Sequence, residues 1–518
     1  MTRARKKIGR VVFVGSGPGD PNLLTGHGHE AIADADLVIV DSDVPEEVRG
    51  YAGPEAEVTE TDDEPAGVAK LLVAEGKAGK NVVRVVRGDV LASERAAKEV
   101  AAVGRSSVPW RIHAAPAPAT AVPAYAGVPT FGPLLHVDLR SFSAGDSLAE
   151  YAALRGTLVA RVELAEIKAL AKALIEGGLA ESTPAAITVD GTTLQQKTVS
   201  GVLGDLTGAN AEVKALEGDA VLIVGANVAS QPKFSWWEKR ALYGWQVLVP
   251  RTKEQAADMS DLLREHGAIP VEVPTIAVEP PRTPAQMERA IKGLVNGRYA
   301  WIIFTSTNAV KAVWEKFREF GLDSRAFAGV KIACVGEATA DAVRAFGVHP
   351  ELVPSGEQSS AGLLEDFAPY DDVLDPIDKI LLPRADIATE TLAEGLKERG
   401  WDIEDVTAYR TVRAAPPAAH IRESIKGGGF DAVCFTSSST VRNLVGIAGK
   451  PHARTVVACI GPATAATAKE FGLRVDVQPE TADVPSVIES LAEYAVHLRD
   501  VEGFDRPPRK TKSRAKKA

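Results

Sequence analysis

Short apolar runs alternate with longer stretches rich in Ala, Leu, Glu and Lys between Arg10 and about Gly225. The apolar runs read VVFVG, DLVIV, NVVRVV, TLVARV, AAITV and AVLIVG, and β-branched residues dominate them. Runs of this length and composition predict buried strands, whereas the stretches between them predict helices. The alternation of the two predicts an α/β fold.

A second series of the same kind follows an aromatic link, FSWWEKRALYGW, around Phe234 to Trp245. Its apolar runs are QVLVPR, WIIFTS, KIACVG, KILLPR, AVCFTS and VVACIG. A chain of 518 residues exceeds what one hydrophobic core usually supports, so several domains are expected. We therefore place the main domain boundary at the aromatic link.

The second series contains an internal repeat. One copy runs from VLVPRTKEQAADM to KIACVGEATADAVRAFGVHPELVP, and the other from ILLPRADIATETL to VVACIGPATAATAKEFGLRVDVQP. The repeat predicts two related lobes. Repeated α/β lobes tend to bind a ligand between them, at the carboxyl ends of their strands. The equivalent residues are Arg251 and Arg384, Ser306 and Ser437, Gly336 and Gly461, Thr339 and Thr464, and Gly347 and Gly472.

Composition narrows the class of protein. No apolar run is long enough to span a bilayer, and the start MTRARKK leads into a strand without a signal-peptide core, which predicts a soluble cytoplasmic protein. Cys334, Cys434 and Cys459 lie inside apolar runs without metal-ligand spacing, so we expect buried, reduced thiols and no metal.

The net charge argues against nucleic-acid binding. It is −10, and phosphate contacts need concentrated Lys and Arg. The basic end RPPRKTKSRAKKA is the exception, and its composition favours a solvated, disordered tail over a nucleic-acid arm.

The segment from Gly244 to about Tyr494 resembles uroporphyrinogen-III synthase. The motifs VPRTKEQA, PTIAVEPP, FTSTNAV, VGEATA, LPRA, AYRT, FTSSSTV and IGPATA occur in the order of that family. The resemblance implies two flavodoxin-like lobes joined by two hinge strands, near Pro274 to Val278 and Thr407 to Thr411. It also implies cofactor-free closure of hydroxymethylbilane to uroporphyrinogen III, with inversion of the last pyrrole.

The resemblance assigns site residues as well. Tyr409 in AYRT corresponds to the cleft tyrosine of the family and would act as an acid or an orienting group, unless it only packs at the hinge. Hydroxyls and amides at the strand ends would bind acetate and propionate groups, although such residues also serve as plain helix caps. Either repeat arginine could grip a carboxylate. The substrate-binding residues expected on these grounds are Arg251, Ser306, Thr307, Arg384, Ser437, Ser438 and Thr464.

The opening VVFVGSGPGDPNLLTGHGHEAIADADLVIVDSDVP resembles the S-adenosylmethionine-dependent uroporphyrinogen-III methyltransferases, of the wider tetrapyrrole methylase superfamily. VPAYAGVP, VDGTTLQQKTVSG and AVLIVGANV continue the resemblance to about Val228. Asp41 falls at the catalytic carboxylate of that family, although it could simply cap the strand end. The cofactor-binding residues implied are Gly15, Gly17, Pro18, Gly19, Gly88, Asp89, Val162 and Gly191.

Four departures concern the same predicted cofactor site. Arg87 and Val90 flank Gly88 and Asp89 where the family has G-G-D-P, which puts a bulky cation in place of a glycine. Ala114 and Ala115 stand where the family has Pro-Gly, and Ala117 and Pro118 stand where it has a Thr-Ala or Thr-Ser contact. Val162 stands where the family has a methionine. The family lysine is absent from the aligned region AEVTETDDEP, which is acidic.

Three hypotheses follow. The chain is a fused enzyme that also methylates uroporphyrinogen III to precorrin-2, or a synthase with a degenerate, non-catalytic methylase domain, or a two-lobed small-molecule binding protein. The methylase resemblance also implies a homodimer, in which Phe234, Trp236 and Trp237 either form the interface or anchor the linker. The domains expected are 8–230 (methylase-like), 231–243 (linker), 244–497 (synthase; lobes 244–273 with 412–497, and 279–406) and 498–518 (tail).

Overall fold

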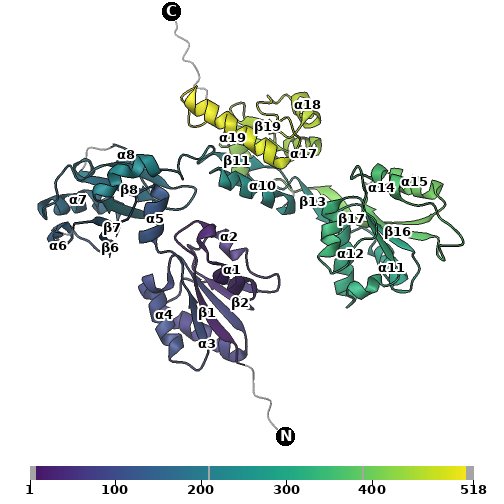
Figure 1. Cartoon of the computed structure of the whole chain (residues 1–518), viewed down its shortest axis with the longest axis horizontal. Helices are drawn as coiled ribbons and strands as arrows, with labels where there is room; N and C mark the ends of the chain where they lie inside the picture. The colour runs from purple at the N-terminus through teal and green to yellow at the C-terminus, as the bar shows by residue number, and fades with distance from the viewer. Residues whose placement is uncertain (1–7, 154, 208–210, 252, 388–389, 509–518) are drawn as a thin grey trace, which may run out of the picture. The chain divides into compact units, whose positions relative to one another are not determined.

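The computed structural model describes residues 8–153, 155–207, 211–251, 253–387 and 390–508. The chain divides into two compact units, and Figure 1 shows its elements coloured from purple at the N-terminus to yellow at the C-terminus. One unit comprises Met1–Val247, Asp261–Pro270 and Leu491–Arg506, and the other comprises Leu248–Ser260, Val271–Ser490 and Pro507–Ala518. Four sheets with helices around them confirm the predicted α/β class.

The first sheet is parallel, in the order β3-β2-β4-β1-β5. Val11 and Phe13 of β1 pack on one face, and Val12 and Val14 pack on the other. Burial on both faces explains why the run VVFVG is apolar throughout. The elements are β1 (Arg10–Gly15), α1 (Gly26–Ala33), β2 (Leu37–Val40), α2 (Glu46–Arg49), β3 (Glu57–Glu60), α3 (Pro65–Ala78), β4 (Asn81–Val86), α4 (Glu94–Gly104) and β5 (Trp110–His113).

The second sheet has the order β6-β7-β10-β8-β9, and only its β6–β7 pair is parallel. Helix α7 packs against the face that carries Leu158 and Ala160. The elements are α5 (Pro118–Ala126), β6 (Leu134–Asp138), α6 (Ala149–Ala152), β7 (Thr157–Val162), α7 (Ile167–Glu176), β8 (Pro184–Val189), β9 (Lys197–Val202), α8 (Ala211–Lys214), β10 (Ala220–Val224) and α9 (Gln231–Phe234).

The third sheet has the order β12-β11-β18-β19, and its strands β18 and β19 are parallel. Phe435 and Leu444 lie at the centre of its core. The elements are β11 (Gln246–Val249), α10 (Lys253–Glu265), β12 (Ile269–Glu272), α16 (Ala419–Gly427), β18 (Ala432–Phe435), α17 (Ser438–Ala448), β19 (Val456–Cys459), α18 (Pro462–Glu470) and α19 (Val484–Asp500).

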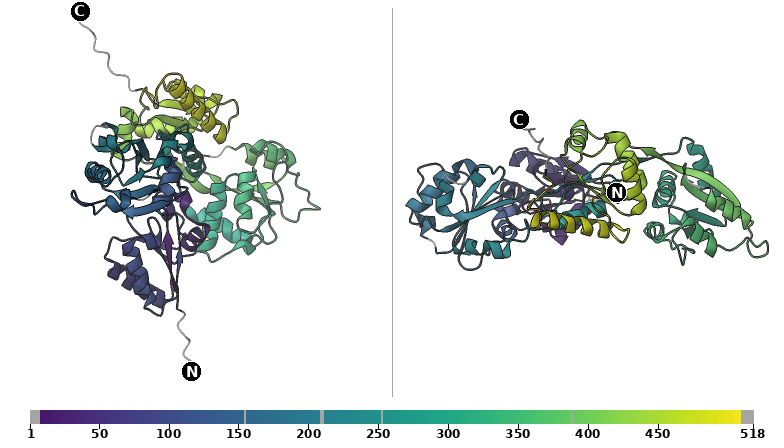
Figure 2. Two further views of the ribbon diagram at one scale, coloured as in Figure 1. Left: turned by 60° about the vertical axis from the view of Figure 1, so that its left-hand side comes forward. Right: turned by 90° about the horizontal axis from the view of Figure 1, so that it is seen from above.

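The fourth sheet has the order β13-β17-β16-β14-β15, and all its pairs are parallel except β13 with β17. The two segments predicted as hinge strands pair with each other, with Val278 opposite Thr411, and β17 is the long strand in Figure 2. The elements are β13 (Ile276–Glu279), α11 (Pro284–Val295), β14 (Trp301–Phe304), α12 (Thr307–Glu319), β15 (Lys331–Cys334), α13 (Glu337–Arg344), α14 (Ser360–Asp366), β16 (Lys379–Ala385), α15 (Thr391–Glu398) and β17 (Asp402–Arg413).

The predicted tail begins too early. Helix α19 continues to Asp500, and the guanidinium of Arg454 donates a hydrogen bond to the carbonyl oxygen of Pro507. These contacts order a segment that composition alone suggested was solvated. Residues 509–518, where the basic side chains concentrate, lie outside the described residues. Among the described residues, no helix is both long and apolar enough to cross a membrane.

All three cysteines are buried and unpaired, as their apolar surroundings predicted. Burial raises the pKa of Cys334 and of Cys434 to about 12, and that of Cys459 to about 11. Since the thiolate is the reactive form, these thiols should be inert near neutral pH.

We therefore expect almost no reaction of the native chain with a thiol-specific disulfide reagent at pH 8, and reaction of all three thiols after unfolding. The absorbance of the thiolate released from the reagent measures the number of reacted cysteines before and after unfolding. A thiol that reacts within seconds in the native chain would show that one of these strands opens readily.

Candidate functional site

Tyr409 and Ser306 form one polar cluster, although they are distant in sequence. The Ser306 Oγ atom lies 3.0 Å from the Tyr409 hydroxyl, and it also accepts the Ala309 N–H as the N-cap of α12. Ser306 follows β14, and Tyr409 lies on β17. Both strands pair with β16, which brings the two hydroxyls together. Tyr409 is 8% exposed, so its hydroxyl is largely withdrawn from water.

The start of α12 adds backbone donors to this cluster. Thr307 is the first residue of the helix and is half-buried. The first N–H groups of a helix lack intrahelical partners and carry partial positive charge, which favours carboxylates. After the neighbouring strand β15, Gly336 is the N-cap of α13, and the side chain of Gln358 accepts the N–H of Glu337. A hydroxyl pair therefore lies beside a set of anion-attracting donors.

The equivalent helices beside the third sheet are α17 and α18, and their N-terminal ends contact each other. Ser437 caps α17 in a capping box with Thr440. Ser438 donates to the carbonyl oxygen of Ala463 at 3.1 Å and accepts from the Thr467 hydroxyl at 2.9 Å, so α17 and α18 begin side by side. Thr464 is 4% exposed in the first turn of α18. Capping therefore accounts for Ser437, while its neighbours hold two helix N-termini together.

The two repeat arginines differ in their surroundings. Arg384 is 5% exposed and donates to Asp405 and Glu390, and its hydrogen bonds with Asp405 raise its pKa. Arg251 lies two residues after the end of β11, and its Nε atom is buried without a hydrogen-bond partner among the described residues. Burial lowers the pKa of Arg251. An unpaired buried donor is costly, so Arg251 is the arginine suited to a carboxylate ligand.

The loop from Gly15 to Asp20 is buried along its whole length. Gly17 and Gly88 exchange two backbone hydrogen bonds, at 3.3 and 2.8 Å, and both have a positive φ of 77° that suits glycine. A Cβ at Gly15 would lie 2.5 Å from the Gly88 oxygen, and one at Gly19 would lie 2.5 Å from the side chain of Thr193. Packing within the chain alone therefore requires these glycines.

The other predicted cofactor residues also have partners within the chain. The side chain of Asp89 accepts the N–H groups of Leu91 and Ala115. Val162 is 2% exposed in the core of the second sheet, and a Cβ on Gly191 would lie 2.6 Å from Val122.

Arg87 decides whether the loop fits a cofactor. Its Nε atom donates to the carbonyl oxygen of Pro18 at 2.8 Å, so its side chain lies against the loop. Among the described loop residues, no buried side-chain nitrogen or oxygen atom lacks a hydrogen-bond partner. The residues present therefore do not fit the S-adenosylmethionine that the sequence resemblance implies.

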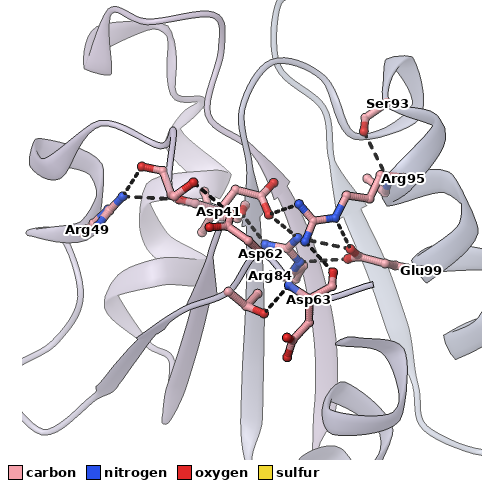
Figure 3. A network of polar contacts seen from close by, with 12 residues as sticks. Asp41, Arg49, Asp62, Asp63, Arg84, Ser93, Arg95 and Glu99 are labelled. Atoms are coloured by element: carbon pink, nitrogen blue, oxygen red, sulfur yellow. Dashed lines mark hydrogen bonds and ion pairs between the residues drawn. The ribbon is translucent and has the colours of Figure 1, made fainter. Parts of the chain in front are cut away.

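Asp41 belongs to a buried ion-pair network (Figure 3). Its Oδ1 atom lies 2.5 Å from Arg84 Nη2 and 3.3 Å from Arg95 Nη1. The side chain of Arg84 is fully buried and also donates to Glu99, which is equally buried. Burial would lower the pKa of Arg84, but the hydrogen bonds with Glu99 and Asp41 outweigh it and raise that pKa. Two arginines thus fix Asp41 in place.

Sequence reasoning missed Arg84, Arg95 and Glu99. One signal was available, because Arg84 interrupts the apolar run NVVRVV at a position that a central strand would bury. Its partner Glu99 lies on a helix, and nothing local marks it. The structure describes no group of three potential metal ligands among residues 8–153, 155–207, 211–251, 253–387 and 390–508.

Comparison with known families matches each half separately. Residues 257–489 match the family "Uroporphyrinogen-III synthase HemD", and residues 10–207 match "Tetrapyrrole (Corrin/Porphyrin) Methylases". Both matches agree with the order of motifs along the chain.

Three curated proteins are similar to all or to part of this chain. "Porphyrin biosynthesis protein HemD" of Ruminiclostridium josui is 29% identical over 94% of this chain and 98% of its own length. "Siroheme synthase 2" of Cronobacter sakazakii is 32% identical over 45% of this chain, which spans about half (53%) of that protein. "Uroporphyrinogen-III C-methyltransferase" of Methanocaldococcus jannaschii is 29% identical over 42% of this chain and 96% of its own length.

The buried network gives a stability prediction. Replacing Arg84 by Met leaves the Glu99 carboxylate buried with only Arg95 nearby, at 3.8 Å, and should cost about 3–5 kcal/mol. Native-state hydrogen exchange at the amides of β1 and β4 in the intact chain measures the loss.

The double variant Arg84→Met with Glu99→Leu removes both charges and serves as the matched control. It should recover much of the loss. Equal losses in the single and double variants would show that the ion pair itself is not the source of the cost.

Proposed function

Because the chain joins a tetrapyrrole methylase domain (10–207) to a uroporphyrinogen-III synthase HemD domain (257–489), we propose that it is a uroporphyrinogen-III synthase of tetrapyrrole biosynthesis. In this proposal it acts in the cytoplasm and closes hydroxymethylbilane to uroporphyrinogen III, with inversion of the last pyrrole. The contact between Tyr409 and Ser306 is the observation that carries the proposal.

Tyr409 acts on the leaving group. Its hydroxyl donates a hydrogen bond, and then its proton, to the terminal hydroxyl of the substrate. The carbon–oxygen bond breaks, water leaves, and an azafulvene cation remains. Ser306, 3.0 Å away and fixed by the helix it caps, holds the tyrosine hydroxyl in the orientation required. The cation bonds to the last pyrrole at the α carbon that already carries the bridging methylene, which gives a spiro intermediate. The older bond to that methylene breaks, and the methylene bonds instead to the free α carbon of the same ring, which is now inverted. The proton lost from that carbon returns to the Tyr409 oxygen, so the step balances.

Carboxylate recognition holds the flexible chain for inverted closure. The acetate and propionate groups bind the N–H groups at the starts of α12, α17 and α18, together with the guanidinium of Arg251. Such positioning favours the inverted product over the spontaneous uninverted one without further chemistry. Because the whole chain carries a net charge of −10, these local donors must offset long-range repulsion of an anionic substrate.

A second activity, methylation of uroporphyrinogen III to precorrin-2 with S-adenosylmethionine, was one prediction from the N-terminal sequence. We derive no step through that cofactor, because Arg87 and the packed glycines do not fit it. The proposal therefore takes the form of a synthase with a non-catalytic methylase domain. The third hypothesis is a binding protein that does not convert its ligand. The assay described next would favour that hypothesis if the wild-type chain failed to form type III product.

Tyr409→Phe tests the acid. With fresh hydroxymethylbilane, the wild-type chain should give mainly type III product, and the variant should lose about tenfold to a hundredfold in kcat, because the proton donor is gone. Oxidation and chromatographic separation of the isomers measure both rate and product.

Tyr370→Phe, which removes another tyrosine hydroxyl from the same lobe, is the control and should leave the rate unchanged. Wild-type-like turnover by Tyr409→Phe would remove the tyrosine from the mechanism. Type I product at the spontaneous rate from the wild type would overturn the proposed function.

Arg251→Gln separates the two repeat arginines. Loss of a charge-assisted contact with a carboxylate should raise KM by about tenfold to a hundredfold with little change in kcat. Arg384→Gln is the matched control, since Arg384 is already paired with Asp405 and Glu390; it should lower the melting temperature and leave KM nearly unchanged. Steady-state kinetics on both variants measure KM and kcat. A raised KM for Arg384→Gln with an unchanged KM for Arg251→Gln would reassign the carboxylate site to Arg384.

A further inference from the structure

Arg87 closes the loop that resembles a cofactor site. Its Nε atom bonds to Pro18, and on either side of Pro18 the chain is already paired: Gly17 with Gly88, and the Asp20 amide with the Thr192 hydroxyl at 3.1 Å. We propose that the Gly15–Asp20 loop is a structural joint, closed by Arg87, that holds the two sheets of the N-terminal half and the linker together and does not bind S-adenosylmethionine.

The joint connects the first sheet to the second. Asp20 accepts a hydrogen bond from the hydroxyl of Tyr125 at 2.7 Å, and its amide donates to Thr192. Thr192 is fully buried and has a φ of 73°, a conformation that is rare for a β-branched residue. The side chain of Gln196 accepts its N–H at 2.8 Å. Tertiary contacts thus maintain a strained residue where the loop meets the turn after β8.

The linker docks on the same turn. Trp237 is 6% exposed, and its indole N–H donates to the carbonyl oxygen of Thr193 at 2.8 Å. The Gln196 amide donates to Glu238 at 2.8 Å, and the ring of Tyr125 lies 4.5 Å from that of Trp237. Tyr125 and Gln196 therefore each contact both the linker and the groups that hold the loop.

The three linker aromatics named from the sequence differ in burial. Trp237 is an anchor, whereas Phe234 and Trp236 remain 54% and 50% exposed. The indole N–H of Trp236 still donates to the Ala124 carbonyl oxygen. The anchoring contacts make the linker an extension of the joint.

A cofactor would have to displace contacts that the chain makes with itself. The loop is buried, and the backbone N–H groups of Gly17 and Gly88 are paired with each other. The guanidinium that bonds to Pro18 is part of the chain and cannot leave as a solvent molecule would. All the contacts that a cofactor would displace lie in the N-terminal half. The proposed joint can therefore be tested independently of the proposed synthase function.

Binding of S-adenosylhomocysteine, measured by isothermal titration calorimetry on the intact chain, tests the joint. The wild type should bind at least tenfold more weakly than Arg87→Gly, in which the closing side chain is gone. Arg105→Gly, which removes an exposed arginine at the end of α4, is the control and should behave as the wild type.

Tight binding by the wild type would overturn the proposal. Equal, undetectable binding by the wild type and Arg87→Gly would refute the role of Arg87 as the closing residue. Protected amides in β1 and β4, measured by hydrogen exchange in all three proteins, show that each N-terminal half is folded. Synthase turnover is measured separately, and its absence in the wild type would count against the proposed function alone.

Hydrogen exchange gives a second readout that does not need a ligand. Removing Arg87 should speed exchange of the amides in the Gly15–Asp20 loop and in linker residues 236–243, because both depend on the joint. Arg105→Gly should leave both segments unchanged. Faster exchange confined to residues 87 and 88 would show that the loop and the linker are not coupled.

Discussion

Backbone groups at the carboxyl ends of the strands must be satisfied by some partner, and the two halves of the chain differ in that partner. In the synthase half, helices α12, α17 and α18 begin at these ends, and only some of their first N–H groups are capped by side chains. In the methylase half, the chain satisfies its own groups, through Gly17 with Gly88 and Arg87 with Pro18. Helix N-termini thus offer donors to a ligand in one half, whereas Gly17 and Gly88 use their N–H groups on each other in the other half.

Strands with buried, apolar residues could be predicted from sequence, including β15 and β19 at two sheet edges, whereas strands with exposed polar residues could not. The runs VVFVG and WIIF, which correspond to β1 and β14, are apolar throughout because both of their faces are buried. The run NVVRVV, which corresponds to β4, is apolar except for Asn81 and the buried Arg84. The strands missed, β3, β5, β6, β9 and β12, all lie at sheet edges, where exposed polar side chains dilute the pattern. Both families were recognised correctly because many of their motifs directly follow buried strands, such as the glycine-rich turn after β1 and the FTS turn after β14.

The candidate sites were predicted less completely, because side-chain pairing is tertiary information. The contact between Tyr409 and Ser306 follows from strand order, and the sequence could name both residues but not join them. Arg251 and Arg384 are equivalent in the repeat, and only Asp405 and Glu390, which pair with one of them, distinguish their roles. Arg87 was noticed as a departure, but its bond to Pro18 showed what the departure does.

The most direct test supplies the intact chain with fresh hydroxymethylbilane and S-adenosylmethionine carrying a labelled methyl group. The products are then oxidised and separated by isomer and by mass. The account predicts type III product, formed faster than the spontaneous reaction and without label. Type I product at the spontaneous rate would contradict the synthase assignment, and labelled type III product would contradict the closed joint while leaving the synthase in place.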